Sequence, residues 1–77
     1  MNRTPQAIKK DILNSILNQK GSAKKTILLR KANLSTTSYD LYVRILIKNE
    51  LIYEIRKGRN ITLHITQKGI KWFWKNK

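Results

Sequence analysis

Cations are the side chains that offer the most chemistry in this sequence. Seventeen Lys and Arg residues stand against four Asp and Glu residues among 77, which gives a formal net charge of +13. Such an excess on a small surface opposes folding by self-repulsion and raises the affinity for polyanions. Nucleic acid is therefore the first partner that the composition indicates, and no small-molecule ligand is evident.

Groups that perform catalysis or bind metals are few and scattered. The sequence has no cysteine, which excludes disulfides, thiolate zinc sites and cysteine nucleophiles. Its single histidine, His64, and its four carboxylates belong to separate segments, and no glycine-rich phosphate loop accompanies them. Glu54 without a clear second acid would hold a metal ion poorly. We predict a protein that is not an enzyme and that has no metal or cofactor.

Length and hydropathy predict a single domain over residues 1–77. A chain of this length buries only about 60% of its unfolded surface and does not divide into two cores. Its 22 Leu, Ile, Val and Phe residues still suffice for a small core. No apolar run approaches the roughly 18 residues of a membrane span, and the N-terminus lacks the apolar stretch of a signal peptide. These features favour a cytoplasmic protein with no membrane partner.

Two helices are predicted in the first part of the chain. Thr4 followed by Pro5 is a typical helix start, and Gly21 is expected to end that helix. A short second helix begins near residues 24–25 and ends at Asn33, a residue type that tolerates the left-handed conformation. The apolar face of the first helix contains Ile8, Ile12, Leu13, Ile16 and Leu17.

A third helix, a hairpin and a last helix follow. Ser35 is a good N-cap, and only about three residues separate the second and third helices, as in a helix-turn-helix. From Leu51 the apolar residues alternate with a period of two on both sides of the turn at 57–60, which predicts a β-hairpin with a basic tip. Thr66 can cap a short final helix, although Gly69 in its first turn is unfavourable. The expected inward residues of these two helices are Tyr39, Tyr42, Val43 and Leu46, then Ile70, Phe73 and Trp74.

The order of these elements is that of a winged helix-turn-helix. We predict a mostly α fold with a β-hairpin (α+β), built from a three-helix core, a wing and a short C-terminal helix. Short motifs occur in order along nearly the whole chain: Lys25-Thr26, Leu28-Leu29, Ala32-Asn33-Leu34-Ser35, Tyr42-Val43, Leu46, Leu51-Ile52 and Thr66-Gln67-Lys68-Gly69. In these motifs the chain resembles the small archaeal winged-helix proteins, which include transcriptional regulators and dimeric chromatin proteins. The resemblance implies a DNA-binding protein of an archaeon or archaeal virus.

Three features depart from that family. Glu50 occupies the position where a glycine usually ends the recognition helix, so a left-handed conformation there would be strained, or the helix would end differently. Ser38 replaces a residue that completes a capping box, so the helix start depends on Ser35 alone. The chain stops at Lys77, about three turns after Thr66, which is too short for the long coiled coil of the chromatin proteins.

The third helix would enter the major groove of DNA, as the resemblance implies, and its first residues and outer face would then meet base edges. Arg44 is the leading candidate to read guanine. Asp40 either accepts from a cytosine amine or pairs with Arg44 four residues on, and Leu41 either packs on a thymine methyl or belongs to the edge of the core. The candidates in this helix are Ser35, Thr36, Thr37, Asp40, Leu41 and Arg44.

Two further groups of side chains would lie beside the duplex. The wing offers flexible donors for phosphates or a narrow minor groove, unless it is merely a solubilising turn. These donors are Arg56, Lys57, Arg59 and Asn60. The start of the second helix favours an anion, and its candidates for a phosphate contact are Lys24, Lys25 and Thr26.

The aromatic run at 72–74 allows several interpretations. A membrane-surface anchor and a base-stacking platform are two of them. We favour closure of the core by Phe73 and Trp74, which leaves Trp72 for a homodimer contact.

Taken together, these features predict a sequence-selective double-stranded DNA-binding protein, a transcriptional regulator that binds a palindromic site as a homodimer. An architectural protein with little sequence preference is the alternative within DNA binding. A winged helix used for RNA or protein contact is the alternative outside it.

Overall fold

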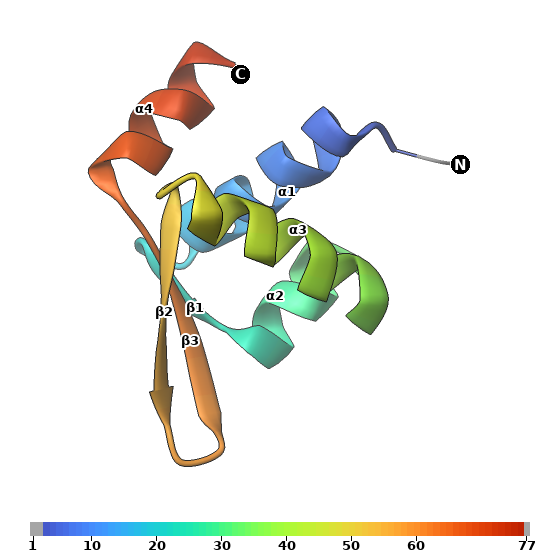
Figure 1. The fold of residues 1–77 in the computed structure, drawn as a ribbon, viewed down its shortest axis with the longest axis vertical. Helices are drawn as coiled ribbons and strands as arrows, with labels where there is room; N and C mark the ends of the chain where they lie inside the picture. The colour runs from blue at the N-terminus through green and yellow to red at the C-terminus, as the bar shows by residue number, and fades with distance from the viewer. Residues whose placement is uncertain (1–2, 77) are drawn as a thin grey trace.

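The computed structural model describes residues 3–76, and in this part of the chain four helices and three strands follow one another as a winged helix-turn-helix (Figure 1). The fold class predicted from the sequence is confirmed. The β2–β3 hairpin extends away from the helices at one end of the molecule, and α4 lies at the other end. The elements are α1 (Pro5–Asn18), β1 (Ser22–Lys24), α2 (Lys25–Lys31), α3 (Thr36–Lys48), β2 (Ile52–Lys57), β3 (Asn60–Ile65) and α4 (Gln67–Lys75).

Side-chain caps begin three of the helices, as the sequence predicts. In each case a hydroxyl oxygen accepts a hydrogen bond from the amide three residues later: Thr4 from Ala7 at 3.1 Å, Ser35 from Ser38 at 3.1 Å and Thr66 from Gly69 at 2.9 Å. Each bond satisfies an amide that the first helical turn would leave without a partner. The cap of α3 therefore does not need the residue at position 38 to complete a capping box.

Three helices end through a residue in the left-handed conformation, and none of these residues is glycine. φ is 63° at Lys20, 53° at Asn33 and 63° at Glu50. The expectation for Asn33 is confirmed. Gly21 is expected to end the first helix, but α1 ends at Asn18 and the first left-handed residue after it is Lys20. After each helix two amides bond back to its last turn in the Schellman pattern.

Lys20 and Glu50 both carry an ordinary side chain in the left-handed region, and we expect Glu50→Gly to stabilise the protein by about 0.5 to 1 kcal/mol. A residue with a Cβ costs roughly 1–2 kcal/mol in the left-handed region, and glycine removes this cost. The greater freedom of glycine in the unfolded chain offsets part of the stabilisation. Urea unfolding measures the difference. Glu50→Gln removes the same charge but keeps the Cβ, so it should show no comparable gain. An unchanged midpoint in Glu50→Gly would show that the helix end is unstrained.

The sheet contains a strand that the sequence pattern does not predict. β1 pairs antiparallel with β3, so the strand order is β1-β3-β2 and β3 is central. β1 has three residues, and only its middle residue, Ala23, is buried. A segment this short cannot display a period of two, and its strand conformation depends on pairing with a partner 40 residues away.

One hydrophobic core joins the helices to the inner face of the sheet. The predicted inward positions of α1 and α3 are confirmed, although Ile8, Leu17 and Tyr42 are only partly buried. Within residues 3–76 no helix has the length and apolar character needed to cross a membrane. The fully buried large side chains are Ile12, Leu13, Ile16, Leu28, Leu46, Ile52 and Leu63.

The aromatic residues of α4 face differently from the prediction. Trp74 is 58% exposed, whereas Trp72 is partly buried against the core beside Phe73. The assignment of Trp74 to the core and Trp72 to the outside is therefore wrong. Gly69 explains the difference: it lies against the carbonyl of Leu51, so the buried stripe of α4 runs through 69, 72 and 73 at the spacing of a helical face.

Candidate nucleic-acid interface

The outer face of α3 is available to a ligand along its whole length. The predicted side chains on this face are all exposed: Thr36, Thr37, Asp40, Leu41 and Arg44. Leu41 is 54% exposed, so its alternative place at the edge of the core is wrong. Two ion pairs occur within residues 3–76, and neither joins Asp40 to Arg44, although both side chains are exposed.

Ser35 is exposed, but its hydroxyl is engaged within the protein. It accepts from the Ser38 amide and donates to the Ser38 hydroxyl, both at 3.1 Å. These bonds position the start of α3.

Arg3 holds the turn that precedes this helix, and the sequence patterns do not single it out. Its guanidinium donates to the Ala32 and Asn33 carbonyl oxygens, each at 2.8 Å, and forms an ion pair with Asp11 at 2.7 Å. These carbonyls lie at the end of α2, where helix geometry leaves acceptors without partners. Arg3 thereby ties the helix-turn-helix to α1, a contact between distant segments that periodicity cannot reveal.

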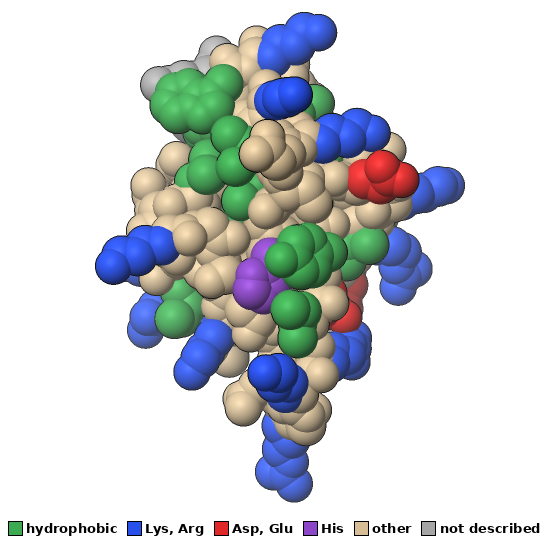
Figure 2. Space-filling model, turned by 90° about the vertical axis from the view of Figure 1, so that its left-hand side faces the viewer, with side chains coloured by type: hydrophobic (Ala, Val, Ile, Leu, Met, Phe, Trp, Pro, Cys, Tyr) green, Lys and Arg blue, Asp and Glu red, His purple; other side chains and the backbone are tan. Residues whose placement is uncertain are grey.

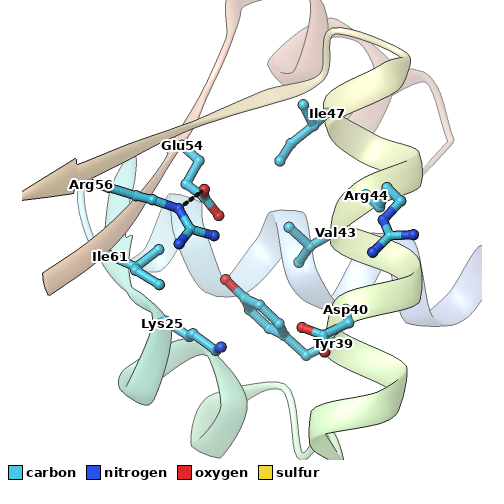
Figure 3. A pocket seen from close by; sticks show the side chains of 9 residues that line it. All are labelled: Lys25, Tyr39, Asp40, Val43, Arg44, Ile47, Glu54, Arg56 and Ile61. Atoms are coloured by element: carbon cyan, nitrogen blue, oxygen red, sulfur yellow. Dashed lines mark hydrogen bonds and ion pairs between the residues drawn. The ribbon is translucent and has the colours of Figure 1, made fainter. Parts of the chain in front are cut away.

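A hollow of about 190 Å³ lies between α3 and the wing (Figure 3). Asp40 and Arg44 line it from α3, Arg56 from β2 and Lys25 from the start of α2. The structure thus brings together members of all three groups of candidates. Glu54 also lines the hollow and accepts a hydrogen bond from Arg56 at 2.7 Å, which raises the pKa of Arg56.

Tyr39 forms part of the wall of this hollow, and Figure 3 shows its hydroxyl directed toward Glu54 and Arg56. Its side chain is 3% exposed, and its hydroxyl has no hydrogen-bond partner among the described residues. Burial, followed by the negative charges of Glu54 and Asp40, raises the pKa of Tyr39 to about 12. The Lys25 ammonium lies 5.0 Å from the centre of the ring, within range of a cation–π interaction.

Because this hydroxyl is buried without a partner, Tyr39→Phe is expected to raise the free energy of unfolding by about 1 kcal/mol at neutral pH. The difference should grow above pH 10. The unfolded tyrosine loses its proton near the ordinary pKa of 10.0, whereas the folded one keeps it to about 12, so the wild type loses stability across that window. Urea unfolding at pH 7 and pH 11 measures both effects, and a variant less stable than the wild type at pH 7 would contradict the unpartnered hydroxyl.

A second hollow of about 100 Å³ adjoins the first through Lys25 and Ile61. It joins the start of α2 to the tip of the wing, whose turn contains Gly58 with φ at 59°. Five of the seven candidates in these two groups line it: Lys24, Lys25, Thr26, Arg59 and Asn60. Lys57 is exposed but lines a different hollow, on the outer face of the sheet. Among residues 3–76 no three His, Asp or Glu side chains are arranged to hold a metal ion.

A family model described as winged helix-turn-helix matches residues 2–76. The chain therefore belongs to the winged helix-turn-helix family, as the resemblance in its motifs implies. A comparison with curated protein sequences found no match.

Solved structures from archaea, an archaeal virus and bacteria share this fold. Sso10a-2, a DNA-binding protein from Sulfolobus solfataricus, has a TM-score of 0.87 and 19% identity, over 96% of this chain and 75% of that one. F93 from STIV, a winged-helix DNA-binding protein, has a TM-score of 0.81 and 18% identity, over 96% of this chain and 86% of that one. The PcaV transcriptional regulator from Streptomyces coelicolor has a TM-score of 0.84 and 16% identity, over 91% of this chain and 53% of its own, so this chain spans about half its length.

Proposed function

We propose that this protein binds double-stranded DNA selectively and acts as a transcriptional regulator. The observation that carries the proposal is the convergence of the three candidate groups, from α2, α3 and the wing, on two adjoining hollows. Cations that flank an exposed helix suit a duplex, because the helix fits the major groove while the flanking cations meet phosphates. The net charge of +13 favours the same partner.

Within this proposal, base contacts come from α3 and phosphate contacts from the flanks. Arg44 has the length and donors to read guanine, while Leu41 and the threonine methyls suit thymine. Asp40, which has no ion pair with Arg44, is a candidate acceptor from a cytosine amine. Ser35 contributes by holding the start of the helix rather than by a contact of its hydroxyl.

The similar proteins support this proposal, because two of them are described as DNA-binding proteins and one as a transcriptional regulator. We propose further that the chain works as one domain in the cytoplasm, without catalytic activity, and that it comes from an archaeon or an archaeal virus.

Homodimerisation is a separate part of the proposal. The packing of Trp72 against the core makes it a smaller contact surface than expected, whereas Trp74 presents the larger exposed area on α4. Exposed aromatic area of this kind is typical of protein interfaces. Light scattering at micromolar concentration tests the dimer, and a monomeric mass would refute it.

An architectural role is the second candidate, favoured by the excess of cations on α1 and α4 as well as at the hollows. Lys9, Lys10, Lys68, Lys71 and Lys75 lie on those two helices. Binding to random duplex as tight as binding to the best selected site would favour this candidate over the regulator.

Arg44→Ala is expected to weaken binding to a selected site by about 1–3 kcal/mol and to relax selectivity at one base pair. Lys57→Ala is expected to weaken all sequences alike, because a flexible cation near a phosphate carries no sequence information. Selection from a random duplex pool supplies the site, and titration of selected and random duplexes measures both effects. Equal losses on every sequence from both variants would refute the assignment of α3 as the recognition helix.

A further inference from the structure

The sheet has two faces, and the first hollow, between α3 and the wing, adjoins the inner one. Ala23, Ile52 and Leu63 turn inward and are buried. Because side chains alternate along a strand and directly paired residues share a face, the residues between them form the outer face. The strand register arranges that face in rows: Ser22, His64 and Tyr53, then Lys24, Thr62 and Ile55, then Asn60 and Lys57.

An aromatic pair and an apolar side chain lie exposed on this outer face. The rings of Tyr53 and His64 stack with centroids 4.9 Å apart and planes inclined by 11°. Tyr53 is 48% exposed, and Ile55 in the next row is 39% exposed. Figure 2 shows the histidine beside hydrophobic side chains on this side of the molecule, with Lys and Arg side chains around them.

A hollow of about 360 Å³ continues from this pair toward the tip of the wing. It lies on the opposite side of the sheet from Glu54 and Arg56, and none of the residues that line it is acidic. The lining combines two cations with polar and apolar groups: Lys24, Ile55, Lys57, Asn60, Thr62 and His64.

We propose that this outer sheet face binds single-stranded DNA, with an unpaired base against the exposed side of Tyr53 and phosphates near Lys24 and Lys57. Aromatic rings stack on any base, and cations beside them hold the backbone. A duplex keeps its bases stacked on one another and so presents phosphates but no base face to Tyr53. A second copy of the chain is disfavoured, because a self-complementary contact would bring the Lys24 and Lys57 charges of both copies together.

This site goes beyond the proposed duplex interface. It shares Lys24, Lys57 and Asn60 with the duplex candidates, and the residues that distinguish it are Tyr53, Ile55, Thr62 and His64. The choice of DNA over RNA rests on the proposed function, since a protein that occupies duplexes meets DNA strands wherever they separate. Such a protein would hold a duplex on α3 and an unpaired strand on the back of the wing.

The test is fluorescence anisotropy of a short labelled oligothymidine, with duplex binding measured in parallel. Tyr53→Ala should weaken oligothymidine binding about tenfold and leave duplex binding within about twofold. Tyr53→Phe keeps the ring and should bind like the wild type. Tyr53→Leu keeps apolar area on the strand but lacks the flat ring, so it should bind oligothymidine as weakly as Tyr53→Ala. It also serves as the second variant if Tyr53→Ala destabilises the sheet. Leu41→Ala, a similarly exposed apolar residue on α3, is the control that should spare oligothymidine.

Several results would overturn the inference. If Tyr53→Leu folds and binds oligothymidine like the wild type, the ring does not stack on a base. If Tyr53 variants lose duplex and oligothymidine binding equally, the two surfaces are one. Tighter binding of oligouridine would refute the choice of DNA, and a fall in mass on substitution of Tyr53 would show a contact between copies. If the protein binds oligothymidine through Tyr53 but does not bind duplex at all, the proposed function is refuted and the single-strand site is not.

Discussion

Gly69→Ala is expected to destabilise the protein by about 3 kcal/mol, a large share of the roughly 5–15 kcal/mol that holds a domain folded. A Cβ at this position would overlap the carbonyl oxygen of Leu51 and would lie 3.0 Å from its carbonyl carbon and 2.8 Å from Cγ1 of Ile65. Backbone atoms cannot rotate away as a flexible side chain can. The helix α4 would therefore have to move, and Phe73 would leave its place in the core.

The attachment of α4 at this point leaves little freedom for such a movement. The Thr66 hydroxyl donates to the Glu50 carbonyl oxygen at 2.7 Å, and the Thr66 amide donates to the Leu51 oxygen at 3.0 Å. Urea unfolding measures the loss. Lys68→Ala, at the exposed neighbouring position, should change stability by less than about 0.5 kcal/mol. A Gly69→Ala protein as stable as the wild type would show that α4 does not approach Leu51 so closely.

Raising the salt concentration from 50 to 200 mM is expected to weaken duplex binding by roughly 10³ to 10⁵, for six to ten phosphate contacts. The physical reason is that each neutralised phosphate releases condensed counterions, and this release becomes less favourable as salt increases. Titration at several salt concentrations gives the slope of log affinity against log salt. A slope near zero would show that the cations around the two hollows do not bind phosphates.

Single substitutions then locate the contacts that produce this slope. Arg59→Ala, at the hollow that joins α2 to the wing tip, should reduce the magnitude of the salt slope by about one. Lys68→Ala, on α4 at the other end of the molecule, should leave it unchanged. Equal reductions from both variants would show that the charge acts over the whole surface, as in the architectural alternative.

Much of the local structure follows from residue types and spacing. The caps at Thr4, Ser35 and Thr66 occur where the sequence predicts them, because a cap depends only on a hydroxyl and an amide three residues away. The exposed face of α3 is equally local, since burial of Val43 and Leu46 on one side of a helix leaves Arg44 on the other. Predictions of this kind need no knowledge of what the helix packs against.

The sequence predictions are wrong or incomplete where contacts with a distant segment determine the local structure. The sequence marks Gly69 as an unfavourable helix residue, but only the carbonyl of Leu51 shows why glycine is there and why Trp72 rather than Trp74 turns inward. The strand β1 exists through its pairing with β3. Arg3 and the unpartnered Tyr39 hydroxyl likewise acquire their roles from residues far along the chain.

The sequence by itself determined the winged helix-turn-helix order, the helix starts, the basic wing and a charge suited to a polyanion, because these depend on periods and short-range bonds. Only the tertiary structure decided which cations share a surface. It placed Lys25, Arg44 and Arg56 around one hollow and put Lys57 on the other side of the sheet with Tyr53 and His64. The face on which a strand residue lies is set by register and by what covers the sheet, and both depend on contacts between distant parts of the chain.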